Sequence, residues 1–225
     1  MSFRKKRQEQ LRPVLLGIIH HHEIGDINDK LYDETLNFIF NFYLCYSIIG
    51  EESSNKLTNV IYKYAESIEN RYNDNLLTEF SDNLKEKLPN KTIFQNAFKN
   101  IGYSKLNSFY EGEKNKDKVQ TVLEVLERYL NGGVCLDDFT IEHVLDDSND
   151  EKNGQIGNLI PLEQNVNNNL NRKNYDQKMD KYSESNYRTT RNFAKRYKDR
   201  DSFDPEKRTK YLADLFYDKI LVLKK

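Results

Sequence analysis

The chain has 225 residues, enough for one large domain or two small ones whose hydrophobic core needs no disulfides. Its 35 Lys and Arg balance 36 Asp and Glu to a net charge of −1, so any attraction to nucleic acid must come from a local basic patch. Isolated Cys45 and Cys135 argue against a four-cysteine zinc site and favour a reducing, cytoplasmic compartment. The N-terminus lacks the apolar core of a signal peptide, which argues against secretion. No run approaches the roughly 18 apolar residues of a membrane span.

The first half of the chain is predicted to be helical, because glycine and proline are rare and apolar residues recur at helical spacing. The helix over 5–19 could kink at Pro13. The apolar stripe of the helix over 29–49 predicts core or a subunit interface, and serines would cap the helix over 53–70. The pattern predicts helices over residues 5–19, 29–49, 53–70, 76–87, 91–101 and 117–130.

A histidine triplet, His20, His21 and His22, follows the first of these helices. Consecutive residues of a helix cannot all face one ion, because each step turns the side chain by about 100°. The triplet therefore favours a helix end or an interaction surface over a metal site.

The pattern changes after Asn131-Gly132-Gly133, which ends the last of these helices. The stretches "DDFTIEHVL" and "IGNLIPL" are rich in β-branched and aromatic residues and predict two short strands joined by a loop. Helices are then expected over 165–183, 187–199 and 204–222, the last with Pro205 in its first turn. The fold is predicted to be mainly α, with a helical domain over residues 1–133 and a second domain over 134–225.

The second domain contains one histidine, His143, followed by many asparagines. One general base and one divalent metal can hydrolyse a phosphodiester, because the base deprotonates water and the metal stabilises charge on the phosphate. Histidine titrates near neutral pH, and asparagine offers the hard carbonyl oxygen that Mg²⁺ prefers. This segment is therefore the candidate site.

Three stretches in this order, "IEHVL", "IGNLIPL" and "QNVNNNL", resemble the motifs of HNH (His-Me finger) nucleases. More narrowly, they resemble the nuclease part of GmrSD-type type IV restriction enzymes, over roughly residues 139–212. That family continues with aromatic-x-x-Lys, Tyr-x-x-Ser and a late helix carrying Arg, for which "YDQK", "YSES" and Arg208 are the matches here. The resemblance implies a helical bundle with a small ββα-metal HNH core.

The resemblance assigns a role to each matching position. His143 would be the general base, Asn167 a metal ligand at a helix start, and Glu142 a second metal ligand. Asn158 would mainly brace the loop between the strands. The implied metal is Mg²⁺ or Mn²⁺. The residues named in supporting roles are Asp146, Asn171 and Lys178.

The chain departs from the family pattern after His143. The third residue on is Asp146 where the family commonly has proline, so it could add a carboxylate to the metal site or only cap the loop. The loop is also acidic, which is unfavourable beside a phosphate unless a metal or the direction of the loop offsets it. Neighbours in a strand point to opposite faces, so Glu142 and His143 reach one metal only if the strand bends or ends there.

Helical spacing predicts which asparagines lie together. If the segment after the second strand is one helix, residues 167, 170, 171 and 174 share a face. Leu170 would then pack on the strands, Asn167 would reach the metal, and Asn171 would support it.

A basic stretch follows the candidate site. Residues 172–200 hold ten Lys or Arg and four Asp or Glu, a net charge of +6. A solvated helix face or a contact with the DNA backbone would explain this composition. The residues predicted to contact DNA are Arg172, Lys173, Arg188 and Arg191.

The function predicted from the sequence is a Mg²⁺-dependent HNH endonuclease that cuts DNA in an antiphage or restriction system. HNH domains of the type that this chain resembles are usually fused to, or paired with, an NTPase. Because no G-x-x-x-x-G-K-[ST] motif is present, the resemblance implies a separate NTPase partner subunit, or a protein whose nuclease half is encoded alone. Two alternatives stay open. One is a catalytically weak helical module that docks a partner in a defence complex, and the other is the same chemistry on RNA.

Overall fold

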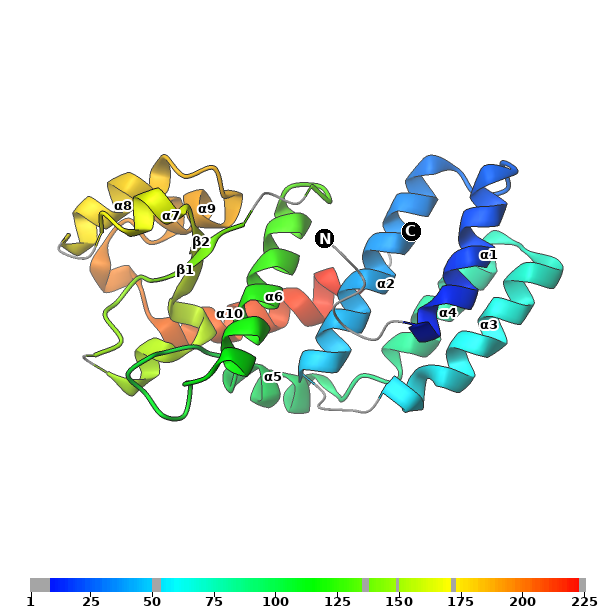
Figure 1. Ribbon diagram of the computed structural model, residues 1–225, viewed down its shortest axis with the longest axis horizontal. Coiled ribbons are helices and arrows are strands. Elements are labelled where there is room, and N and C mark those ends of the chain that lie inside the picture. The colour runs from blue at the N-terminus through cyan, green and yellow to red at the C-terminus, as the bar shows by residue number, and fades with distance from the viewer. Residues whose placement is uncertain (1–8, 50–53, 135–137, 149, 171–172, 223–225) are drawn as a thin grey trace. The chain divides into compact units, whose positions relative to one another are not determined.

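The computed structural model describes residues 9–49, 54–134, 138–148, 150–170 and 173–222 (Figure 1). These ranges are mainly helical, which confirms the predicted class. None of their helices is long and apolar enough to cross a bilayer. Cys135 and the side chain of Cys45 lie outside the described part.

The helices are α1 (Arg12–Glu23), α2 (Asp29–Ile49), α3 (Thr58–Arg71), α4 (Asp74–Lys85), α5 (Lys91–Lys99), α6 (Glu113–Leu130), α7 (Gln164–Asn167), α8 (Tyr175–Ser183), α9 (Arg188–Arg196) and α10 (Pro205–Leu215). The strands are β1 (Thr140–His143) and β2 (Leu159–Leu162).

The chain forms two compact units. The first comprises residues 1–91 and 217–225, and the second comprises residues 92–216. The boundary predicted from the sequence lies after Gly133 instead. The two divisions differ because α6 packs against α9 and β2, so that it joins the second unit.

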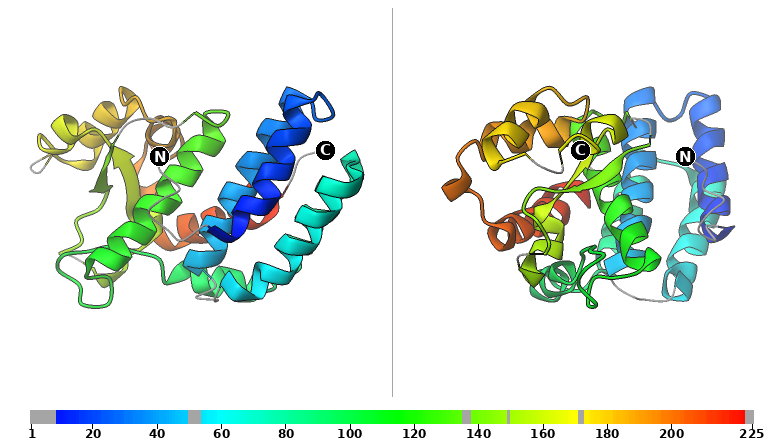
Figure 2. Two further views of the ribbon diagram at one scale, coloured as in Figure 1. Left: turned by 45° about the vertical axis from the view of Figure 1, so that its right-hand side comes forward. Right: turned by 60° about the vertical axis from the view of Figure 1, so that its left-hand side comes forward.

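The first unit is a bundle in which α1 and α2 pack on each other and on α3 and α4 (Figure 2). Its core contains Ile18, Ile61 and Phe80, each fully buried. Pro13 lies in the first turn of α1 and does not kink it, because the first helical positions need no amide hydrogen bond. The expected serine cap is replaced by a 3-10 turn, Ser54–Leu57, that leads directly into α3.

The histidine triplet closes α1, as one reading of the sequence expected. The ring of His21 contacts Asp26 Oδ2 at 2.7 Å and the carbonyl of Ile68 at 2.9 Å. His22 contacts Asp29 Oδ1 at 2.9 Å. These contacts tie the end of α1 to the chain that follows and to α3.

The second unit is built on a two-stranded antiparallel sheet of β1 and β2. Glu142 pairs with Ile160 and His143 with Leu159, so the side chains of Glu142 and His143 leave opposite faces. α8 and α9 cover the face of Glu142 (Figure 1). The core on that face contains Val144, Ile160, Leu162, Leu170, Met179, Tyr182, Phe193, Ala194 and Phe203.

The long helix expected over residues 165–183 is broken in two. α7 ends at Asn167, and α8 begins only at Tyr175. The break follows from Asn174, whose side chain accepts the amide of Gln177 while Gln177 bonds back to the amide of Asn174. The prediction that residues 167, 170, 171 and 174 share one helical face is therefore wrong, and Asn171 lies outside the described residues.

The start of β2 is anchored by α10. The Arg208 guanidinium donates to the carbonyls of Gly157 at 2.7 Å and Leu159 at 3.0 Å. Burial lowers the pKa of Arg208 to about 10, which still leaves the group charged at neutral pH. The Thr209 hydroxyl accepts the amide of Gly157 at 3.0 Å. α10 therefore fixes the backbone just before β2.

Candidate active site

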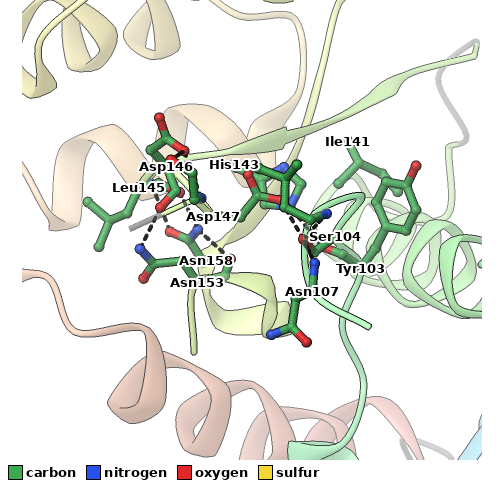
Figure 3. A network of polar contacts seen from close by, with 12 residues as sticks. Tyr103, Ser104, Asn107, Ile141, His143, Leu145, Asp146, Asp147, Asn153 and Asn158 are labelled. Carbon is green, nitrogen blue, oxygen red and sulfur yellow. Dashed lines mark hydrogen bonds and ion pairs between the residues drawn. The ribbon is translucent and has the colours of Figure 1, made fainter. Parts of the chain in front are cut away.

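His143 is the last residue of β1, and its ring is oriented by a distant backbone group. Nε2 lies 2.7 Å from the carbonyl oxygen of Tyr103 (Figure 3). A carbonyl can only accept, so Nε2 must carry the proton in this contact. The neutral ring then has its lone pair on Nδ1, which is the arrangement of a general base.

The Tyr103 carbonyl is itself held by the loop between the strands. Gly102 forms a β-bridge with Gln155, the amide of Tyr103 donates to Gly154 O at 2.8 Å, and the amide of Ile156 donates to Ile101 O at 2.9 Å. A Cβ on Gly102 would lie 2.4 Å from Gly154 O, so this close approach needs glycine. The residues 101–104 thus extend the site. They were not predicted from the sequence, because the contacts of Ile101, Gly102 and Tyr103 are made by backbone atoms and leave little signal in side-chain identity.

Asp147 also approaches the ring and was not predicted. Its Oδ2 lies 3.6 Å from His143 Nε2 and accepts the Ser104 hydroxyl at 2.6 Å. Its place in the loop, four residues after the histidine, was noted only as part of an acidic run.

Asn158 braces the loop between the strands, as the resemblance implied. Its side chain accepts the amide of Leu145 at 2.9 Å and donates to Leu145 O and Asn153 O, each at 2.7 Å. It is fully buried, and its own carbonyl accepts the amide of Val144. These contacts hold the chain directly after His143 and do not point the side chain at a substrate.

Asp146, which replaces the expected proline, closes a turn. Its Oδ1 accepts the amide of Ser148 at 2.8 Å and the Ser148 hydroxyl at 2.6 Å. These two hydrogen bonds lower the pKa of Asp146 below its usual value. Of the two roles considered for this carboxylate, the contacts are those of a loop cap.

Glu142 lies on the helical face of the sheet, in contact with two side chains of α8. Its Oε1 accepts Lys178 Nζ at 2.8 Å and the Tyr182 hydroxyl at 2.7 Å. Burial and the neighbouring Glu142 raise the pKa of Tyr182, so its hydroxyl stays a donor. Lys178 also donates to the carbonyls of His143 at 3.0 Å and Val144 at 3.2 Å. Lys178 thereby ties α8 to the end of β1.

Asn167 was expected at a helix start but is the last residue of α7, and it points its amide nitrogen at β1. Nδ2 donates to Thr140 Oγ1 at 2.9 Å and to Ile141 O at 3.4 Å. The Thr140 hydroxyl uses its own proton on Leu162 O, so it can only accept from Asn167. The orientation of the amide is therefore fixed. The Asn167 oxygen faces away from these acceptors, and no described residue hydrogen-bonds to it.

The residues predicted to contact DNA differ in their surroundings. Arg172 lies outside the described residues, and Lys173 directly precedes the cap of α8. Arg188 and Arg191 lie on α9, where each guanidinium bonds a backbone carbonyl, of Leu130 and Ser185 respectively. A guanidinium has five donors, so these contacts leave donors for a phosphate.

The donor set suits a hard cation that keeps much of its water. Among the described residues, no three His, Cys, Asp or Glu side chains gather where they could hold a metal. Mg²⁺ typically takes only one or two carboxylates and retains several waters. Glu142 has a carboxylate, whose Oε1 already accepts from Lys178 and Tyr182, and Asn167 has an amide oxygen to which no described residue hydrogen-bonds.

These features define a mainly helical protein with a polar site on a two-stranded sheet, in which the ring of one histidine is held by a backbone carbonyl. The sequence matches the family described as GmrSD restriction endonucleases, C-terminal domain, over residues 77–215. Since this match covers more than half of the chain, the protein belongs to that family and is assigned as a nuclease of restriction or defence. No curated protein matches the chain. The family match begins upstream of the motifs, at α4, so it includes the residues 101–104 that orient His143.

Proposed function

We propose that the protein is a metal-dependent HNH endonuclease with a ββα-metal core that hydrolyses DNA phosphodiester bonds. The observation that carries the proposal is the hydrogen bond between His143 Nε2 and the Tyr103 carbonyl. It commits one ring nitrogen to the protein and leaves the lone pair of the other for a water molecule.

In the proposed reaction, His143 Nδ1 takes a proton from water as the water oxygen attacks phosphorus. The phosphorus–oxygen bond to the sugar breaks, and the leaving oxygen takes a proton from a solvent water, while His143 later returns its own proton to solvent. Tyr103 holds the ring in place during this step. Asn158 and Lys178 hold the backbone on which His143 sits, through Leu145 and through the His143 carbonyl.

Glu142 and Asn167 are the residues that would hold Mg²⁺ or Mn²⁺. A bound divalent cation supplies Lewis-acid stabilisation of charge on the phosphate and the leaving oxygen. Lys178 and the Tyr182 hydroxyl hold the Glu142 carboxylate in a fixed position, and the contacts with Thr140 and Ile141 fix the Asn167 amide. His143 is the last residue of β1, and its side chain leaves the face opposite to that of Glu142.

DNA is the proposed substrate, because the family is named for restriction endonucleases and because residues 172–200 carry a net charge of +6. A separate NTPase subunit is the proposed partner. It would bring the nuclease to foreign or modified DNA.

The test is cleavage of supercoiled plasmid by the full chain with Mg²⁺ or Mn²⁺, alone and with a candidate NTPase and nucleotide. We expect metal-dependent nicking that EDTA abolishes and that His143→Ala lowers by at least a hundredfold. His22→Ala, which alters an exposed contact in the first unit, is the matched control and should cleave normally. Absence of cleavage in every setting, or unchanged cleavage by His143→Ala, would refute the proposal. RNA offered in parallel would show whether the same chemistry prefers that substrate.

A further inference from the structure

We infer that Asp147, oriented by the Ser104 hydroxyl, is a positioning residue that holds the His143 ring in the form with its proton on Nε2. The inference deepens the proposed function, since it concerns how the proposed base is prepared. It also concerns a residue pair that no motif of the site includes. Ser104 precedes α6 and Asp147 follows β1, so the pair forms only in the folded second unit.

The hydrogen bonds that the Ser104 hydroxyl accepts determine where its proton points. Its oxygen accepts the amides of Leu106 at 2.9 Å and Asn107 at 3.0 Å. Both lone pairs are therefore used, and the single proton goes to Asp147 Oδ2 at 2.6 Å. Ser104 is fully buried, so water does not compete for that bond. The carboxylate is thus held in place by a donor that is itself fixed.

Asp147 in turn favours one form of the His143 ring. Its Oδ2 lies 3.6 Å from Nε2, beside the carbonyl of Tyr103. With a proton on Nε2, the ring presents an N–H to both oxygens. With the proton on Nδ1, a lone pair would face both oxygens, and repulsion would turn the ring. The side chains of His143 and Asp147 are 20% and 16% exposed, so solvent screens this interaction less than it would at the surface.

The consequence for the site is a base prepared before substrate arrives. The Tyr103 carbonyl supplies the hydrogen bond, and Asp147 supplies a negative charge that makes the opposite form of the ring unfavourable. Groups that orient a functional histidine through its second nitrogen typically change activity by about tenfold to a hundredfold when removed. We expect that range here, with the loss in kcat and an unchanged KM for DNA, because Asp147 contacts the base and not the substrate.

The experiment compares wild type with Asp147→Asn, Asp147→Glu and Ser104→Ala in the full chain. Long-range proton–nitrogen NMR spectra, recorded where the ring is neutral, report which nitrogen of His143 carries the proton, and His143→Gln identifies the signals. Wild type should show the proton on Nε2. Asp147→Asn and Ser104→Ala should show a mixture of the two forms and a kcat lowered tenfold to a hundredfold. Asp147→Glu, which keeps the charge, should keep part of the preference for a proton on Nε2 and part of the wild-type kcat. Asp82→Asn, an exposed carboxylate of α4, is the control and should change neither.

The ring measurement separates this inference from the proposed function, since it needs no activity. If the protein never cleaves but Asp147→Asn alters the ring, the positioning role stands and the nuclease proposal fails. If the protein cleaves and both the ring form and kcat of Asp147→Asn match wild type, the inference is wrong. If Asp147→Asn does not fold, the ring form and kcat of Ser104→Ala and Asp147→Glu test the inference in its place.

Discussion

His21 and His143 differ in how many of their ring nitrogens contact the protein. His21 uses both, one on Asp26 and one on the Ile68 carbonyl, so it holds a helix end. His143 uses Nε2 on Tyr103, and no described residue hydrogen-bonds to its Nδ1. Both partners of His21 are acceptors, so neither of its ring nitrogens presents a lone pair to water. This difference between His21 and His143 makes His143 the candidate base in chemical terms.

The brace formed by Asn158 gives a prediction about stability. Asn158→Ala removes three hydrogen bonds and leaves the amide and carbonyl of Leu145 and the carbonyl of Asn153 without that partner. We expect a loss of about 2–4 kcal/mol in the free energy of unfolding, measured in urea, because buried polar groups are costly to leave unpaired. Asn168→Ala, an exposed asparagine nearby, should change it by less than about 0.5 kcal/mol. Equal stability of the two variants would contradict the brace.

The turn at Asp146 gives a prediction about acid titration. The Ser148 hydrogen bonds lower the pKa of Asp146, so the turn contributes stability above the ordinary aspartate pKa and loses it as pH falls through the lowered value. Ser148→Ala removes the hydroxyl donor and should raise the pKa of Asp146, as followed by NMR of its carboxyl carbon. Ser202→Ala, whose hydroxyl bonds a backbone carbonyl, should leave that pKa unchanged. If the pKa of Asp146 is the same in Ser148→Ala as in wild type, the turn opens in solution.

At the scale of elements, the second unit is held by contacts between distant segments. The carboxylate of Glu127 in α6 accepts the amides of Arg188 at 2.7 Å and Thr189 at 2.8 Å, so it caps α9 from outside that helix. Tyr187, the residue at the N-cap position, makes no side-chain cap of its own. The negative carboxylate also suits the positive end of the helix dipole. α6 therefore belongs with α9 for a physical reason.

Replacing this cap should weaken the second unit. Glu127→Gln keeps one oxygen acceptor but turns an NH₂ group towards an amide that needs an acceptor. We expect a loss of about 1–3 kcal/mol in the free energy of unfolding. Glu66→Gln, an exposed glutamate of α3, should stay within about 0.5 kcal/mol of wild type. If both variants unfold like wild type in urea, the cap is not a source of stability.

The approach of α10 to the sheet gives a second prediction at this scale. A Cβ on Gly157 would lie 2.4 Å from Thr209 Oγ1 and closer still to the Pro205 carbonyl, so Gly157→Ala must push α10 away. We expect a loss of about 3 kcal/mol or more and weaker binding of Arg208 to the strand. Gly17→Ala in α1 meets only the Ile68 side chain, whose Cγ2 atom lies at 3.0 Å, and gains helix propensity, so its change should be much smaller. Thermal unfolding of both variants distinguishes these outcomes.

The elements show which parts of the fold were readable from the sequence. Long amphipathic helices such as α2 and α6 could be predicted, because the helical spacing of their apolar residues is visible in the local sequence. The break before α8 could not, because Asn174 competes with helix through a cap whose effect depends on geometry. Asn158 could be recognised within a motif. The pairing of residues 101–104 with the loop could not, because that bridge is made by backbone atoms far apart in sequence.

At the scale of the whole molecule, charge is nearly balanced overall but uneven along the chain. The net charge is −1, while residues 172–200 carry +6. The rest of the chain is therefore acidic. A polyanion would be attracted to one stretch and repelled elsewhere, which favours binding in a defined orientation over general adhesion. Lys195 and Lys198 are exposed in this stretch and are not part of the proposed catalytic machinery.

This uneven charge predicts how DNA binding depends on salt. Each phosphate contact releases counterions, so log K falls with log salt by about 0.9 for each contact made to duplex DNA. In the presence of Ca²⁺ to prevent cleavage, Lys195→Ala with Lys198→Ala should weaken binding and make the slope shallower by between about 1 and 2. Lys30→Ala with Lys87→Ala removes the same charge from exposed positions of the first unit and should leave the slope unchanged. If both double variants weaken binding equally, the basic stretch is a solvated helix face, and DNA is held elsewhere. Fluorescence anisotropy titrations at several salt concentrations measure both quantities.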